Sequence, residues 1–135
     1  MTITIKTDSR PIKNQADIVY ARQAVRDWAI ELKLGILDQT KLITAASELA
    51  RNTYVYGLGG DMLMEMLSDG LRKGIRLTFE DHGPGIANLS LALTDGWTSG
   101  GGLGMGLTGA KRLVSEFHIV STPGVGTKVT ITKWK

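Results

Sequence analysis

The spacing of hydrophobic residues predicts a first strand and a first helix near the start of the chain. Polar and apolar residues alternate over Thr2–Thr7, with Ile3 and Ile5 on one side, which is typical of a strand. Over Asp17–Lys33 the apolar residues recur at helical spacing, so we expect an amphipathic helix with Gly35 as its C-cap. The apolar positions of this helix are Ile18, Ala21, Val25, Trp28, Ala29 and Leu32.

Two further helices are predicted by the same periodicity. One covers Asp38–Tyr56, with Asp38 as its N-cap and Gly57 directly after its end. Its packing face would consist of Leu42, Ala46, Leu49 and Thr53. The other lies in the C-terminal third of the chain. Its buried face would consist of Leu107, Ala110, Leu113, Val114 and Phe117.

Four apolar runs predict two β-hairpins. Met62–Leu67 and Gly74–Glu80 are joined by a segment that contains the turn signal Asp69-Gly70. Phe117–Ser121 and Thr127–Lys133 are joined by a turn rich in proline and glycine. Tight turns join antiparallel strands, so the sheet should be largely antiparallel, with three helices covering one face. The predicted fold is therefore a two-layer α+β sandwich.

Composition narrows the class of protein. The 135 residues are 42% hydrophobic and 21% charged, which suits one compact globular domain, residues 1–135. A net charge of +3, spread along the chain, suits phosphate ligands or an acidic partner but is too small and scattered to indicate nucleic acid. Without cysteine there are no disulfides and no thiolate metal sites. We expect a cytoplasmic protein, because no apolar run approaches the roughly 20 residues that span a membrane.

A carboxylate and an amide lie four residues apart in the second predicted helix. Glu48 and Asn52 project from one face, one turn apart. Such a pair is able to hold a hydrated Mg²⁺ and to take a proton from an attacking hydroxyl group. Polar pairs at this spacing also decorate many solvated helix faces, so the pair alone does not decide between the two interpretations.

A second polar segment, Asp81-His-Gly-Pro-Gly85, directly follows a predicted strand. A carboxylate at a strand end followed by glycines is able to accept a hydrogen bond from an exocyclic amine while the backbone closes on a flat ring. A plain turn held by the Asp81 side chain is an equally good interpretation.

The third segment is the glycine-rich run Gly100–Gly106, which leads into the third predicted helix. Glycines let backbone N–H groups approach an anion, and a helix N-terminus adds partial positive charge, so the run predicts a phosphate-binding loop. It is not a Walker A loop, because no Gly-Lys-Ser/Thr is present. The residue set of eukaryotic-type protein kinases is absent as well.

Taken in order, the three segments resemble the N, G1 and G2 boxes of the GHKL superfamily, which includes gyrase, Hsp90, histidine kinases and MutL and has the Bergerat fold. The runs Ser47–Asn52, Glu80–Ile86 and Ser99–Leu107 resemble the RsbT-like serine/threonine kinases, which are stressosome switch kinases related to the anti-sigma factor kinases. Gly126-Thr127 and Lys133-Trp134 extend the resemblance over essentially the whole chain.

The resemblance implies a role for individual residues. Glu48 would act as the general base or would orient the attacking hydroxyl group, and Asn52 would ligate the Mg²⁺ that bridges the ATP phosphates. Asp81 would bind the adenine amino group, with Gly85 giving the ring room, and Thr127 would hold adenine through a water molecule. The phosphates would be wrapped by Gly102, Gly104 and Gly106. The remaining nucleotide contacts implied are Gly83, Ile86, Gly101, Leu103, Met105 and Leu107.

The resemblance also implies a lid over residues 88–101 and a set of partners. Kinases of this group phosphorylate serine or threonine on STAS-domain proteins of the RsbS and RsbR type, and after release they activate a PP2C-type, RsbU-like phosphatase. No nucleic acid or membrane partner is expected. The oligomeric state stays open, a weak homodimer included.

Two other functions remain open from the sequence. One is an anti-sigma factor, an RsbW-like kinase that sequesters a sigma subunit. The other is an ATPase module that has lost its protein substrate. The acceptor residue and the upstream signal are not indicated by any motif.

Overall fold

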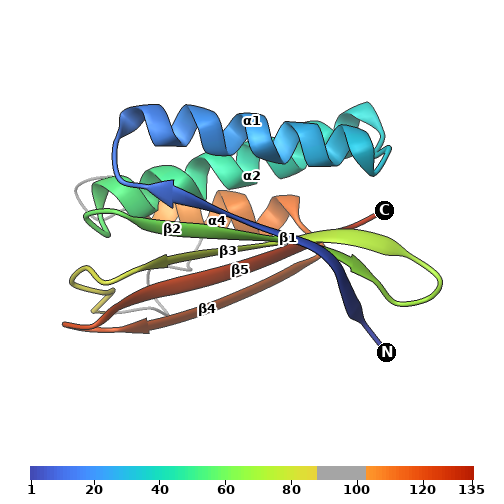
Figure 1. Ribbon diagram of the computed structural model, residues 1–135. Coiled ribbons are helices and arrows are strands. Elements are labelled where there is room, and N and C mark those ends of the chain that lie inside the picture. The colour runs from blue at the N-terminus through green and yellow to red at the C-terminus, as the bar shows by residue number, and fades with distance from the viewer. Residues whose placement is uncertain (88–102) are drawn as a thin grey trace.

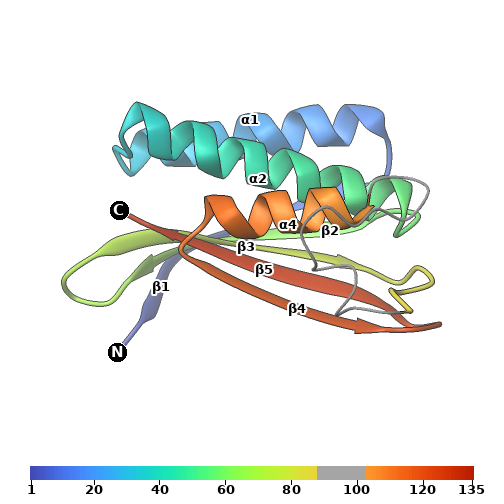
Figure 2. The same ribbon diagram turned by 180° about the vertical axis from the view of Figure 1, so that it is seen from behind.

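Five antiparallel strands and three helices form two layers in the described residues, 1–87 and 103–135 of a computed structural model (Figures 1 and 2). The strand order in the sheet is β1-β2-β3-β5-β4. The strands are β1 (Ile3–Ile12), β2 (Gly60–Ser68), β3 (Lys73–Asp81), β4 (Glu116–Thr122) and β5 (Gly126–Trp134). The helices are α1 (Gln15–Glu31), α2 (Ile36–Val55) and α4 (Leu103–Leu113), and all three lie on the same face of the sheet (Figure 1). The predicted α+β sandwich is confirmed.

The core lies between the sheet and the helices. On the inner face of β2 and β3, alternate side chains are fully buried, which is the period of two that a half-covered strand requires. These side chains include Met62, Met64, Ile75, Leu77 and Phe79. The predicted packing face of α2 is confirmed, because Leu42, Ala46, Leu49 and Thr53 are all buried.

Strand β1 is longer than the sequence predicts. It continues to Ile12, whose side chain is fully buried, whereas Ile3 and Ile5 are 56% and 51% exposed. The register with β2 shifts between Thr4 and Lys6, which marks a bulge. Pro11 does not end the strand, because β1 is an edge strand and one of its sides needs no hydrogen-bond donors.

The boundary between α1 and α2 corrects two predictions. Gly35 is not the C-cap of α1, because Lys33 takes the left-handed position after the helix, with φ of 62°. The Lys33 N–H donates to the Ile30 carbonyl and the Leu34 N–H donates to Ala29 at 3.1 Å, which is a Schellman motif. This arrangement buries the Leu34 side chain in the core. That burial favours a helix that ends with its C-cap at Leu32 over one that continues to the predicted cap at Gly35.

Asp38 is not the N-cap of α2. Gly35 holds that position with extended backbone, and its carbonyl accepts the N–H of Gln39. Asp38 lies in the first turn, where a carboxylate is favoured by the helix dipole, and it pairs with Lys133 at 3.3 Å. The predicted end of α2 is confirmed, since Tyr56 is the C-cap and Gly57 follows.

Asp69 organises the turn of the confirmed β2–β3 hairpin. Its carboxylate accepts the backbone N–H groups of Arg72 and Leu71. The hydrogen bond from Arg72, followed by that from Leu71, lowers the pKa of Asp69 to about 2. The stability that these hydrogen bonds give the turn is therefore fully present at pH values above the ordinary pKa of an aspartate. It is lost as the pH falls through about 2, where the Asp69 carboxylate becomes protonated.

Helix α4 packs against α2 and ends at Leu113. Leu107 and Ala110 are buried as predicted, and Leu113 and Val114 pack partly against the core. Phe117 belongs to β4 rather than to the helix. None of the helices in the described residues is long and apolar enough to cross a membrane.

The N-terminal cap of α1 generates a stability prediction. The Asn14 side chain accepts the backbone N–H of Asp17 at 2.9 Å, and the Asp17 carboxylate accepts that of Lys13 at 2.8 Å. Asn14→Ala should lower the free energy of unfolding by about 1 kcal/mol, because one helix N–H loses its acceptor. Urea unfolding at neutral pH measures this change. Asn14→Ser is the control and should stay within a few tenths of a kcal/mol of the parent chain; an alanine variant as stable as the serine variant would contradict the capping role.

Candidate functional site

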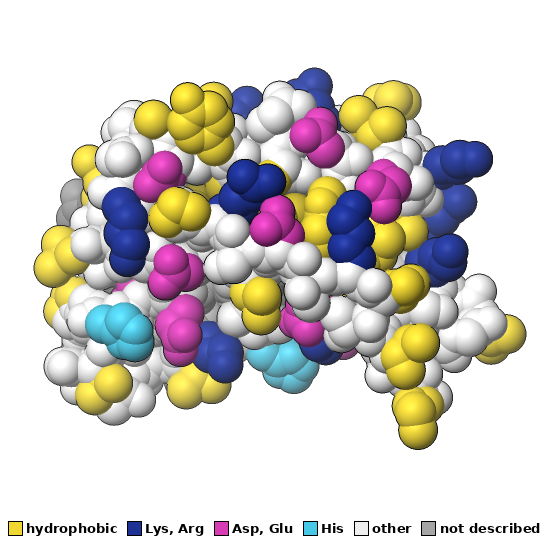
Figure 3. Space-filling model, in the orientation of Figure 1, with side chains coloured by type: hydrophobic (Ala, Val, Ile, Leu, Met, Phe, Trp, Pro, Cys, Tyr) yellow, Lys and Arg dark blue, Asp and Glu magenta, His cyan; other side chains and the backbone are white. Residues whose placement is uncertain are grey.

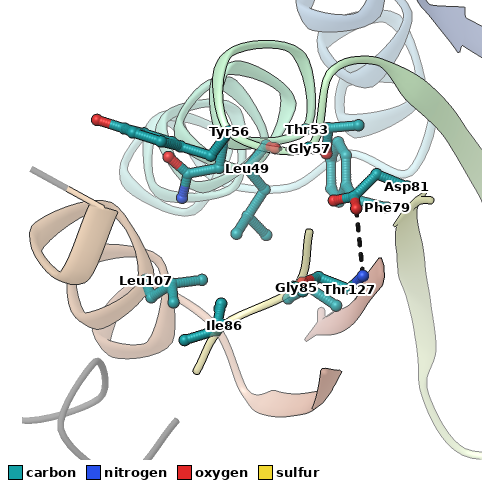
Figure 4. A pocket seen from close by; sticks show the side chains of 12 residues that line it. Leu49, Thr53, Tyr56, Gly57, Phe79, Asp81, Gly85, Ile86, Leu107 and Thr127 are labelled. Atoms are coloured by element: carbon teal, nitrogen blue, oxygen red, sulfur yellow. Dashed lines mark hydrogen bonds between the residues drawn. The ribbon is translucent and has the colours of Figure 1, made fainter. Parts of the chain in front are cut away.

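One cavity opens where the end of α2 meets the ends of β3 and β5 (Figure 4). It measures about 420 Å³, counting space open to solvent. Residues from four elements and from the segments that follow α2 and β3 line it: Leu49, Asn52, Thr53, Tyr56, Gly57, Phe79, Asp81, Gly85, Ile86, Leu107, Thr127 and Val129. Leu49, Phe79, Ile86, Leu107 and Val129 give the cavity apolar walls, and polar groups stand among them, which is the usual make-up of a small-molecule site.

Asp81 is the acidic group of this cavity. It is the last residue of β3 and is only 9% exposed. Its Oδ1 accepts two backbone N–H groups, from Gly83 at 3.0 Å and from Thr127 at 3.2 Å, the second of which is drawn in Figure 4. In the described part of the chain, Oδ2 accepts no hydrogen bond and no cation pairs with this carboxylate. One oxygen is therefore structural, and the other is left for a donor in the cavity.

Glycines allow the backbone to approach Asp81. A Cβ on Gly57 would lie 2.3 Å from the Asp81 Oδ2, so any side chain there would displace the carboxylate. Gly85 has φ of 75°, and a Cβ there would lie 2.4 Å from the carbonyl oxygen of Thr122. Gly85 thus lines the cavity, but its need for glycine comes from close packing against the β4–β5 hairpin.

Asn52 carries an unsatisfied polar atom beside the same cavity. Its Nδ2 is buried and has no hydrogen-bond partner in the described residues. Buried polar atoms without partners are rare, and each one needs an explanation. The two ends of an amide are assigned from hydrogen bonding, so either the nitrogen or, after a half turn, the oxygen is available to a ligand. The residues fit a ligand that brings phosphate oxygens or a cation to this position.

Glu48 lies outside the lining of this cavity, although it is one turn before Asn52. Its side chain is exposed and borders a shallow surface groove between α1 and α2, together with Arg22 and Arg51. The predicted common face of Glu48 and Asn52 is thus divided: Asn52 is half-buried against the cavity, and Glu48 faces solvent.

The remaining predicted residues lie in several different places. Asp81, Gly85, Ile86, Leu107 and Thr127 line the same cavity as Asn52, while Gly83 is buried against the backbone of Gly57. The backbone of Leu103, Gly104, Met105 and Gly106 forms the first turn of α4. Gly101, Gly102 and the predicted lid over residues 88–101 lie outside the described residues.

Ser121 is a polar residue of the site that the sequence analysis missed. Its hydroxyl accepts the backbone N–H of Ile86 at 2.8 Å and lies 2.8 Å from the Thr127 hydroxyl. It therefore ties the segment after β3 to the β4–β5 hairpin. The turn between β4 and β5 places Ser121 directly opposite Thr127. The register of the predicted hairpin is therefore the feature of the sequence from which a role for Ser121 could be predicted.

Six further lining residues are predicted by the sequence only as packing, strand or helix-end residues. They are Leu49, Thr53, Tyr56, Gly57, Phe79 and Val129. Figure 4 shows the Leu49 side chain pointing from α2 toward Ile86 and Leu107, with Asp81 on the opposite side of the space. An apolar slot with a carboxylate at one end is suited to a flat ring that bears an exocyclic amine.

Comparison with known proteins identifies relatives of the chain. Residues 37–135 match the model of the histidine kinase-, DNA gyrase B- and HSP90-like ATPases. The chain is 45% identical to the serine/threonine-protein kinase RsbT of Bacillus subtilis (strain 168), over 91% of this chain and 92% of that protein. It is 30% identical to the anti-sigma F factor of Clostridium novyi (strain NT), over 84% and 83% of the two chains.

A solved structure has a similar fold. It contains the RsbU and RsbW domains of a Mycobacterium tuberculosis protein and matches all of this chain with a TM-score of 0.64 and 21% sequence identity. The matched region is 32% of that longer chain.

The two hydrogen bonds of the Asp81 Oδ1 generate a second stability prediction. Asp81→Ala should lower the free energy of unfolding by about 2–4 kcal/mol, because one buried and one partly buried N–H group lose their acceptor. Asp81→Asn keeps an oxygen at the same place and should lose about half of that or less. Urea unfolding of both variants tests this, and equal losses for alanine and asparagine would show that Oδ1 does not hold the turn.

Proposed function

Because this chain belongs to the family of histidine kinase-, DNA gyrase B- and HSP90-like ATPases, we propose that it binds ATP and acts as a serine/threonine protein kinase. The acceptor is a hydroxyl group on a partner protein in a partner-switching pathway. The family and the 45% identity to RsbT support the nucleotide and the reaction class.

The observation that carries the proposal is the single cavity shared by Asn52 and Asp81. The two residues come from α2 and from the end of β3, which are far apart in sequence. Within the described residues, the Asn52 amide nitrogen has no hydrogen-bond partner and the Asp81 Oδ2 accepts no hydrogen bond, and both groups lie along the same apolar slot. A ligand with an amine-bearing ring and a polyanionic tail satisfies both groups at once.

Each lining group then has a role toward the nucleotide. Asp81 Oδ2 accepts the exocyclic amino group of adenine, and Leu49, Ile86 and Leu107 contact the ring faces. Asn52 holds a hydrated Mg²⁺ through its amide oxygen, and the ion, when bound, neutralises charge on the phosphate oxygens. The backbone N–H groups at the start of α4 face the phosphates. Thr127, fixed by Ser121, contributes a polar edge beside the ring.

Glu48 serves as the base that orients or deprotonates the acceptor hydroxyl. Its exposed position in the groove between α1 and α2 leaves it open to a protein substrate, while the nucleotide occupies the neighbouring cavity. Catalysis in phosphoryl transfer depends mainly on positioning and charge neutralisation, so a base just outside the nucleotide cavity is sufficient.

The finer assignment of partners follows from the RsbT-like resemblance. We propose a STAS-domain protein of the RsbS or RsbR type as the acceptor and a PP2C-type, RsbU-like phosphatase as the second partner. An anti-sigma function is the second candidate, favoured by the 30% identity to an anti-sigma F factor. The higher identity to RsbT over a larger share of the chain supports the switch kinase. Co-purification with a sigma factor instead of a STAS protein would decide for the alternative.

Nucleotide binding is tested at Asp81. Asp81→Asn retains the structural acceptor but presents an NH₂ group in place of Oδ2, so it should weaken ATP binding by about tenfold or more, equivalent to about 1.4 kcal/mol. Isothermal titration calorimetry with a non-hydrolysable ATP analogue measures the affinity. Unfolding of the same sample controls for stability, and a folded variant that binds as tightly as the parent chain would rule out the adenine assignment.

Phosphoryl transfer is tested at Glu48. Glu48→Gln should reduce transfer to a STAS-domain protein by at least about 100-fold, because the base is lost. ATP affinity should stay within about twofold of the parent value, because Glu48 lies outside the cavity lining. Radiolabelled ATP with Mg²⁺ measures transfer, and calorimetry measures binding. Steady hydrolysis by the parent chain without any transfer would favour an ATPase module instead.

A further inference from the structure

A second concave surface lies at the opposite end of the sheet from the nucleotide cavity. It is bounded by the end of α1, by the β2–β3 turn and by Lys135, which follows β5. We call it the basic cleft. Its lining residues are Glu31, Leu32, Lys33, Met66, Leu71, Arg72, Lys73 and Lys135. Both ribbon views place the α1–α2 turn, the β2–β3 turn and the C-terminus at this end (Figures 1 and 2).

Positively charged side chains outnumber negatively charged ones in the basic cleft. Figure 3 shows Lys and Arg side chains gathered at this end of the molecule. The Glu31 carboxylate is already paired with Lys6 at 2.8 Å, and Arg72 is paired with Asp69 at 3.0 Å. Lys33, Lys73 and Lys135 form no ion pair within the described residues. Three unpaired ammonium groups therefore surround one concavity.

The backbone holds these lysines in place. Lys33 is fixed by the Schellman hydrogen bonds at the end of α1. The Lys135 N–H donates to the carbonyl of Lys73 at 2.9 Å, which joins the two residues across the sheet. Arg72 stacks on the Trp134 ring at 4.3 Å beside them. The backbone of these lysines is thus held by ordered structure, which keeps the three side chains around the same concavity.

Lys33 occupies a backbone conformation that favours glycine. Its φ of 62° is unusual for a residue with a side chain. Residues kept in such conformations at a cost in stability often serve a function. Here the residue that accepts the strain also supplies one of the three unpaired charges.

We propose that the basic cleft is the docking site for an acidic segment of a partner protein. Its floor is apolar, formed by Leu32 and Met66, and the Leu71 side chain at its rim is 97% exposed. An acidic segment with an apolar side chain among its carboxylates complements both features. Nucleic acid fits less well, because it offers phosphates along a long duplex, whereas the cations of the basic cleft surround one short concavity with an apolar floor.

The site is independent of the proposed kinase chemistry. Strand β3 runs from Lys73 at the basic cleft to Asp81 at the cavity, and its length at about 3.3 Å per residue separates them by roughly 25 Å. Changes in the basic cleft should leave ATP affinity unaltered, so a failure here is distinguishable from a failure of the proposed function.

The experiment uses the ¹⁵N-labelled chain and a Glu-rich peptide with one central leucine. Adding the peptide should shift the amide signals of Lys33, Leu71 and Lys73, and a peptide with Gln in place of Glu should not. Lys33→Glu combined with Lys73→Glu should weaken peptide binding by at least about tenfold. Lys128→Glu, on β5 at the other end of the sheet, is the control for a single charge reversal outside the basic cleft and should keep the parent affinity.

Lys33→Gly separates binding from folding. Relief of the left-handed strain should raise the midpoint of thermal unfolding by a few degrees, while loss of the charge weakens peptide binding. A more stable variant that binds the peptide as tightly as the parent chain would overturn the proposal. So would equal shifts of the same amides by oligothymidylate of matched charge, because the cleft would then be a general polyanion surface.

Discussion

The position of the candidate site depends on how one buried carboxylate is satisfied. Asp81 ends a central strand at the edge of the core, and a charge there is costly unless it receives hydrogen bonds. Its Oδ1 accepts N–H groups from the turn after β3 and from the start of β5. Gly57 leaves the space for the carboxylate beneath the end of α2. Three separate segments are thereby positioned around the same side chain, and the cavity is the space that remains between them.

The sheet could be predicted from local patterns because its signals are local. A period of two in β2 and β3, with Asp69-Gly70 between them, determines both the hairpin and the face that is buried. The ends of α1 and β1 depend instead on tertiary packing. Burial of Leu34 outweighs the preference for glycine at Lys33, and the edge position of β1 removes the penalty for Pro11. Neither the neighbours of Leu34 nor the edge position is visible in the sequence.

The sequence predicts the polar residues of the site more reliably than the residues that surround them. Asn52 and Asp81 were singled out from spacing and from a strand end, and the fold brings them to one cavity. Leu49 and Thr53 were assigned to packing, yet the same stripe also lines the cavity, because the core continues into it without a boundary. Ser121 is not indicated by the sequence, because its role arises from a contact across a hairpin and single hydroxyl groups form no pattern along the chain.

The separation of Glu48 from the cavity has a consequence for the kind of reaction that the site favours. Asn52 is half-buried beside the cavity, whereas Glu48, one helical turn away, faces solvent in the groove between α1 and α2. In the proposed role of a base, Glu48 would meet water as readily as any substrate and would gain little from a low local dielectric. It becomes selective for a protein hydroxyl only when the acceptor protein covers the groove and excludes water. In a kinase built this way, docking of the partner completes the catalytic site, and the chain alone should be a poor ATPase.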